Sequence, residues 1–233
     1  MAFNLLIDYD NLNASDQTKG LIYIAENILS QLSPSEVSDK NVLVRLYGGW
    51  YENNKITRKA ENLKADILRD FPRPALLSDS KTSVIVNTEL ATSLTIQPTL
   101  FLANTYRRNG IPSGLKAYHP IRNGCKRTSC PVLHVYNFVQ AGICGECNTA
   151  TVEDIFYRSE QKLVDTMLTS DMILIAQQEK KYGIVSSDDD FWPGILTSIT
   201  IGSTVYHFQT QRGRTTPPHY SRTVNHNYYM KSL

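Results

Sequence analysis

The segment FNLLIDYDN, residues 3–11, opens with an apolar run and ends in Asp8, Asp10 and Asn11. A short continuous apolar run is typical of a strand that is buried on both faces of a parallel sheet. Carboxylates this close repel one another unless a cation, a basic group or water offsets their charge. The segment therefore predicts a central strand with a polar site at its carboxyl end.

The chain beyond this strand alternates between helical and strand patterns. Apolar residues at helical spacing between Asp16 and Pro34 predict a helix, and NVLVRLY (41–47) predicts a second strand. Later segments predict a helix at 54–70, a strand of an added hairpin at 83–90, a helix at 98–109, a strand at 115–121, a helix from about 159 past 172, a strand at 182–187, a helix at 188–200 and a strand at 203–208. This alternation predicts a doubly wound α/β fold, in which helices cover both faces of a mostly parallel sheet.

The composition is that of one large globular domain or of one domain with an insertion. The chain has 233 residues, of which 41% are hydrophobic, enough to form a sizeable core. Because 24 basic and 22 acidic residues give a net charge of +2, any nucleic-acid surface must be local. We find neither a leader-like start nor an apolar run of about 20 residues, so we expect a cytoplasmic protein without a membrane span.

Carboxylates follow two of the predicted strands. Asp8 closes the first strand, Asp188 and Asp190 follow the strand at 182–187, and Asp165 lies in the helix before it. In doubly wound folds ligands bind beyond the carboxyl ends of the strands, so we expect Asp8 and Asp188 to be neighbours. Oxygen ligands suit Mg²⁺ or Mn²⁺, which support phosphodiester hydrolysis. Helix capping is the alternative for Asp190, and a solvated helix face is the alternative for Asp165.

Three blocks in this order, LIDYDNLN (6–13), QKLVDTMLTSD (161–171) and VSSDDDFWP (185–193), resemble the signature blocks of NYN domains in the PIN-like nuclease superfamily. The resemblance covers roughly residues 3–208 and implies a PIN-like three-layer sandwich. It also implies a metal-dependent ribonuclease, with RNA as the substrate. The long interval between the helix at 54–70 and Lys162 departs from the compact form of the family.

The resemblance also implies roles for individual residues. Asp8, Asp165 and Asp188 match the family's ligands for Mg²⁺ or Mn²⁺, and Asp190 matches its second acid. The supporting residues would be Asn11, Asp10, Lys162 and Ser187. The implied reaction is attack of a bound water on phosphorus, which leaves a 5′-phosphate and a 3′-hydroxyl.

The four cysteines lie close together as a Cys-x4-Cys pair and a Cys-x2-Cys pair: Cys125, Cys130, Cys144 and Cys147. Two short-spaced thiolate pairs predict a structural Zn²⁺ site, which would fix an insertion at residues 122–150. Buried reduced cysteines are the alternative, and His119 or His134 could replace one thiolate.

Basic residues accompany this insertion and the C-terminal tail, residues 209–233. We expect them to contact RNA phosphates: Arg122, Lys126, Arg127, Arg212 and Arg214. A solvated face and a poorly ordered terminus are the alternatives. The nuclease-like domain itself is predicted for residues 1–208.

Two other functions are compatible with the sequence. The Asp8-x-Asp10 pair also resembles haloacid dehalogenase phosphatases, although that reading leaves Asp165 without a role. The third candidate is a non-catalytic RNA-binding module that retains its acids for structural reasons. The sequence leaves open whether the chain forms a homo-oligomer or binds a protein partner.

Overall fold

The computed structural model describes residues 2–37, 39–102, 105–109, 129–156, 158–161, 163–211 and 226–233. The chain divides into two compact units. The first comprises Met1–Tyr106 and Gln161–Leu233, and the second comprises Arg107–Glu160. The second unit contains the predicted insertion at 122–150 and is longer than it at both ends.

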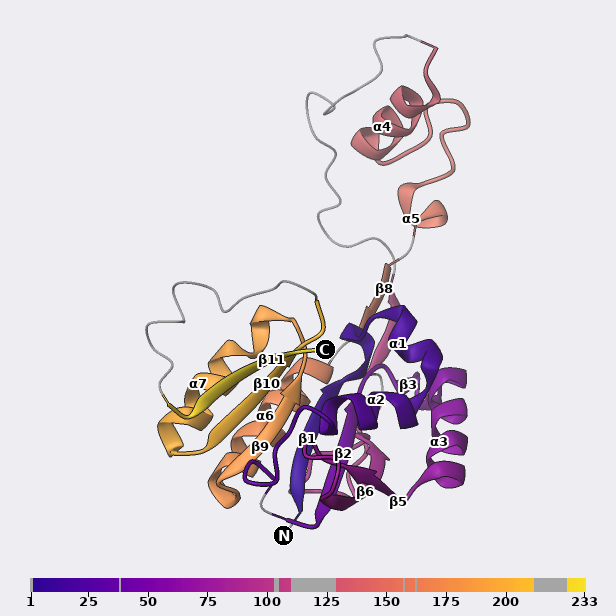
Figure 1. Cartoon of the computed structure of the whole chain (residues 1–233). Coiled ribbons are helices and arrows are strands. Elements are labelled where there is room, and N and C mark those ends of the chain that lie inside the picture. The colour runs from indigo at the N-terminus through magenta and orange to yellow at the C-terminus, as the bar shows by residue number, and fades with distance from the viewer. Residues whose placement is uncertain are drawn as a thin grey trace. The chain divides into compact units, whose positions relative to one another are not determined.

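A mostly parallel sheet forms the centre of the first unit (Figure 1). In the described residues its strand order is β11-β10-β9-β1-β2-β6-β5, and only β5 is antiparallel to its neighbour. The strands are β1 (Phe3–Asp8), β2 (Asn41–Tyr47), β5 (Arg73–Leu76), β6 (Ser83–Leu90), β9 (Lys181–Val185), β10 (Thr204–Gln209) and β11 (Tyr228–Ser232). The chain order reverses between β1 and β9, which makes their carboxyl ends the expected place for a ligand.

Helices cover both faces of this sheet, as the α/β prediction requires (Figure 1). On one face, α2 (Leu21–Leu29) and α3 (Arg58–Asp70) pack with Leu5, Ile7 and Val44 of the sheet. On the other face, α6 (Val164–Gln178) and α7 (Trp192–Ile201) pack with Leu6 and Ile184. The alternation of Leu5, Leu6 and Ile7 between the two cores explains why β1 is apolar on both sides.

Several helix boundaries differ from the sequence predictions for local reasons. The helix expected between Asp16 and Pro34 is divided into α1 (Ala14–Lys19) and α2, because Gly20 has a φ of 88°. Helix α3 begins at Arg58 because the Thr57 hydroxyl caps it and β4 (Lys55–Ile56) pairs with β3 (Tyr51–Glu52). Within the described ranges, no helix combines the length and the apolar character needed to cross a membrane.

Two predicted segments fold differently. Residues 83–90 form β6, which pairs antiparallel with β5, as a hairpin would. It also pairs in parallel with β2, so it belongs to the central sheet and not to a separate hairpin. The helix predicted at 98–109 is wrong, because residues 98–102 are irregular and Tyr106–Asn109 form strand β7. Glu52 pairs with Tyr106, and a tertiary pairing of this kind overrides a helical spacing of apolar residues.

The later helices also begin after short stretches of other structure. Residues Arg158–Gln161 form β8, so α6 begins at Val164 and not near Ser159. The 3-10 turn η2 (Asp189–Phe191) precedes α7. A similar turn, η1 (Tyr9–Asn11), follows β1.

The second unit contains α4 (Pro131–Ala141) and α5 (Val152–Ile155). Pro131 lies at the first turn of α4, and Gly142 ends this helix with a left-handed φ of 77°. Thr151 and Asp154 form a capping box at the start of α5. The strand predicted at 115–121 lies outside the described residues.

Candidate acidic site at the carboxyl edge of the sheet

Four carboxylates lie on elements that meet where the sheet order reverses. Asp8 ends β1, and Asp188 and Asp190 follow β9, its neighbour in the sheet. Asp165 lies in the first turn of α6, which packs on the same face as α7. The charges of Asp165 and Asp188 act on Asp8, and the charges of Asp188 and Asp190 act on Asp165. The fold therefore gathers these four acids into one electrostatically connected cluster, here called the acidic cluster.

Asp8 is the buried member of the acidic cluster. Its side chain is 5% exposed, and Oδ2 accepts a hydrogen bond from the Ser186 hydroxyl at 2.9 Å. Burial is the main cause that raises the pKa of Asp8 to about 7. The hydrogen bond from Ser186 lowers this pKa, whereas the charges of Asp165, Asp10 and Asp188 raise it. Ionised Asp8 is therefore costly to keep in this position without a neutralising partner.

Asp165, Asp188 and Asp190 are more accessible than Asp8. Burial raises the pKa of Asp165, and the charges of Asp188 and Asp190 raise it further. Asp188 Oδ1 accepts from the Asp190 amide at 3.0 Å and so caps η2. The capping side chain is therefore Asp188 and not Asp190, for which the sequence considered this role. In the part of the chain that the structure describes, no Lys or Arg pairs with any member of the acidic cluster.

Asp10 and Asn11 point to other partners. Asp10 pairs with Lys59 of α3 and accepts from the Gly49 amide at 3.0 Å. The Asn11 Oδ1 atom accepts from the Ser187 amide at 3.1 Å, and thus joins the ends of β1 and β9. Both residues therefore hold the loops around the acidic cluster, and the paired Asp10 does not support a phosphatase that uses Asp8 and Asp10 together.

Ser186 is a site residue that the sequence reasoning did not name. Its hydroxyl donates to Asp8 and accepts from the Asp188 amide at 3.1 Å, so one side chain links two acids from neighbouring strands. Ser187, which the sequence proposed as a supporting residue, instead accepts from the Thr210 amide at 2.8 Å. The signal for Ser186 was present in the sequence, because it is the serine two positions before Asp188.

Several predicted site residues lie outside the described residues. They are Lys162, the predicted RNA contacts Arg122, Lys126, Arg127, Arg212 and Arg214, and the first thiolate, Cys125. Their predicted roles stay predictions.

The other three cysteines belong to the second unit. Cys144 and Cys147 form a tight turn, in which the Asn148 amide donates to the Cys144 carbonyl at 2.9 Å. The Ala150 amide donates to Cys147 Sγ at 3.4 Å. Hydrogen bonds from Thr149, Ala150 and Cys144 lower the pKa of Cys147 to about 6, so its thiolate, the metal-binding form, is accessible near neutral pH. Cys130 precedes α4 in the same unit.

The carboxylate oxygens of the acidic cluster are suitable ligands for a hard cation, although they do not converge on a single metal position in this structure. Among the described residues, no three His, Cys, Asp or Glu side chains are grouped closely enough to hold a metal ion. Mg²⁺ is usually held by one or two carboxylates together with several waters, so it does not require such a group. The donors offered are oxygens on Asp8, Asp165 and Asp188 that accept no hydrogen bond from the described residues.

Comparisons with known proteins add no family to this description: no protein-family model, no curated protein and no solved structure matches the chain.

Proposed function

We propose that the chain is a metal-dependent ribonuclease of the NYN type, in which the acidic cluster holds Mg²⁺ or Mn²⁺ at the carboxyl edge of the sheet. The observation that carries the proposal is the environment of Asp8. A buried carboxyl faces three further acids and has no basic partner among the described residues. An arrangement of this kind is unfavourable for folding and is typical of sites where a cation supplies the missing charge.

The choice of RNA as substrate rests on the three sequence blocks that resemble NYN domains. A hard cation bound by carboxylates is suited to phosphoryl transfer, and the sheet edge leaves Asp165 exposed to a large ligand. The sheet order supports the position of the site, since a doubly wound sheet presents its ligand site at the switch point, here between β1 and β9.

The residues of the chain have separable roles in this proposal. Asp8, Asp165 and Asp188 would hold the ion, which when bound activates a water and neutralises phosphate charge. Ser186 orients Asp8 through its hydroxyl and positions the Asp188 backbone. Asn11 joins the two strand ends, so that Asp8 and Asp188 keep their separation.

The decisive experiment compares Asp188→Asn with Asp189→Asn on end-labelled RNA in the presence of Mg²⁺ or Mn²⁺. Asp189 is adjacent in sequence and carries the same charge, whereas Asp188 is the residue whose charge raises the pKa of both Asp8 and Asp165, so Asp189→Asn is a matched control. We expect divalent-dependent cleavage by the wild type and by Asp189→Asn, and loss of cleavage in Asp188→Asn without any loss of thermal stability.

Other outcomes identify the competing functions. Undiminished cleavage by Asp188→Asn would refute the assignment of the acidic cluster. Binding of RNA by the wild type without cleavage in either cation would favour the non-catalytic module. Release of phosphate from a simple monoester without RNA cleavage would favour the phosphatase.

We further propose that the second unit holds a structural Zn²⁺ ion. The support is the turn at Cys144 and Cys147, where backbone amides face a thiol of low pKa, as thiolate ligands of zinc require. Cys130 and Cys125 would complete a tetrahedral site. The test is metal analysis of the purified protein, in which about one equivalent of zinc is expected.

A further inference from the structure

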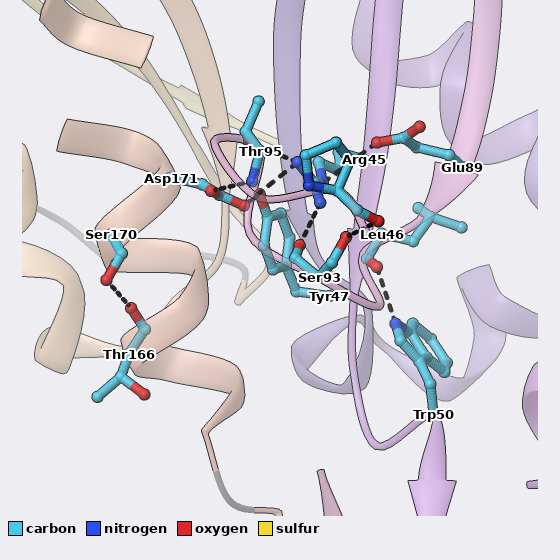
Figure 2. A network of polar contacts seen from close by, with 11 residues as sticks. Arg45, Leu46, Tyr47, Trp50, Glu89, Ser93, Thr95, Thr166, Ser170 and Asp171 are labelled. Carbon is cyan, nitrogen blue, oxygen red and sulfur yellow. Dashed lines mark hydrogen bonds and ion pairs between the residues drawn. The ribbon is translucent and has the colours of Figure 1, made fainter. Parts of the chain in front are cut away.

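A buried polar network links α6 to β2 and uses no member of the acidic cluster (Figure 2). It joins Arg45 and Tyr47 of β2 with Asp171 of α6 and with residues 93–95 of the segment that follows β6. Asp171 and Tyr47 are 0% exposed and Arg45 is 5% exposed. Charged side chains are rarely buried this deeply, so a specific role for them has to be sought.

The contacts of Asp171 use both of its oxygens. Oδ2 accepts from the Tyr47 hydroxyl at 2.9 Å and lies 3.4 Å from the Arg45 guanidinium, and Oδ1 accepts from the Thr95 amide at 2.8 Å. Arg45 also donates to the Ser93 carbonyl and lies 3.2 Å from Glu89. Asp171 can therefore make all of these contacts only when α6 has one particular orientation about its helix axis.

The buried apolar residues of α6 lie on the same face of the helix as Asp171: Val164, Met167, Leu168, Met172, Ile175 and Ala176. Their contacts are non-directional, whereas the hydrogen bonds of Asp171 are directional and restrict the rotation further. The first turn of the helix has apolar anchors but no polar one. Leu163, at the N-cap, has a φ of 68°, and no side-chain hydrogen bond caps the helix there.

Asp165 depends on the same rotation. It precedes Asp171 by six residues, which places it about 9 Å away along the axis and about 120° around it. Asp171 therefore faces Arg45 and Tyr47, while Asp165 faces the acidic cluster. A rotation of α6 by one residue, about 100°, would turn Asp165 away from Asp188.

We propose that Arg45, Tyr47 and Asp171 are positioning residues, which fix the rotation of α6 and so hold Asp165 at the acidic cluster. An effect of this network on metal binding rests on the proposed function. Its role in fixing the rotation of α6 is independent of that function and is tested separately.

The test replaces the network by apolar side chains of similar size, as Arg45→Met, Tyr47→Phe and Asp171→Leu together. Replacement of a whole buried ionic network often leaves stability unchanged or higher. We expect a folded variant whose Mn²⁺ affinity, measured by calorimetry, falls about 10- to 100-fold. Ser203→Ala is the matched control, because the Ser203 hydroxyl donates to the carbonyls of Ala176 and Glu179 at the other end of α6. It should lower stability and leave Mn²⁺ affinity unchanged.

The second measurement uses NMR of the methionine methyl groups to detect a change in the rotation of α6 in metal-free protein. The chain has four methionines, and Met167 and Met172 are buried in α6, with Met172 packed on Gly194 of α7. In methyl-labelled protein, both resonances should be single in the wild type and should shift or split in the triple variant. If the triple variant does not fold, Tyr47→Phe alone should still shift them and weaken Mn²⁺ binding about fivefold.

The outcomes separate the two proposals. Unchanged methyl resonances and unchanged Mn²⁺ affinity in a folded variant would overturn the positioning role. If the wild type binds no Mn²⁺ and the resonances still move, the proposed function fails while the role of the network in fixing α6 stands.

Discussion

Substitution of Asp8 by Asn should stabilise the metal-free protein, although it removes a proposed ligand. Asn has nearly the shape of Asp, and its oxygen can still accept from the Ser186 hydroxyl. Because Asn carries no charge, the variant avoids the ionisation of a buried group beside three other acids.

The magnitude follows from the pKa of Asp8, which is about 7 in the folded chain against a reference value of 3.8. The folded protein binds the proton more tightly than the unfolded chain, so its stability falls as the pH rises from about 3.8 to about 7. The difference amounts to about 4 kcal/mol once the pH exceeds 7. The gain from Asp8→Asn should therefore be near zero at pH 4 and approach this value at pH 8.

The assay is urea unfolding of both proteins at pH 4, 6 and 8 in the presence of a chelator. Taking the difference between the two proteins cancels the titration of all groups outside the acidic cluster. Ser186→Ala is a control of opposite sign, since it removes the donor to ionised Asp8 and should lower stability most at pH 8. A pH-independent difference between wild type and Asp8→Asn would contradict the reasoning, as would a loss of stability at pH 8.

Three further predictions concern other parts of the chain. Gly48→Ala should cost about 1–3 kcal/mol in urea unfolding, because the new methyl would approach the buried Trp50 ring to 2.7 Å. Glu36→Gln should lower stability at pH 7 by about 1 kcal/mol. Burial opposes ionisation of Glu36, but the Ser33 amide and Lys231 outweigh it and lower its pKa, so the loss should disappear as the pH falls below 4.5. With the proposed zinc site, Cys147→Ser should contain less zinc than the wild type when both purified proteins are analysed by mass spectrometry.

The strands of the first unit were predictable because they are short apolar runs followed by polar residues. Residues 3–8 and 41–47 form strands with the expected bounds, and their parallel pairing follows from the helix between them. Segment 98–109 was mispredicted because apolar spacing carries no information about distant partners. The pairing of Tyr106 with Glu52 is fixed by tertiary structure alone.

The candidate site shows a similar division. That Asp8 and Asp188 lie at the carboxyl ends of neighbouring strands could be inferred from the alternation of elements, since ligand sites at the switch point of such a sheet are a general rule. The buried network was not predicted, although Arg45 in the apolar run NVLVRLY was a signal, because a charge on a buried strand requires a partner. The identity of that partner, Asp171, depends on the packing of α6 and cannot be obtained from spacing.

The pairing of β11 with β10 determines how the end of the chain can be altered. Residues 228–232 belong to the segment that the sequence treats as a tail, yet they form the outermost strand on this side of the sheet. A chain shortened before residue 226 would leave β10, whose side chains are buried from Val205 to Gln209, with an unpaired row of N–H and C=O groups. Such a row is a template for pairing between molecules, whereas the opposite edge strand, β5, carries Pro74, which lacks an N–H donor. We therefore expect the final strand to protect the protein against aggregation, so the role of the basic residues before it is better tested by substitution than by truncation.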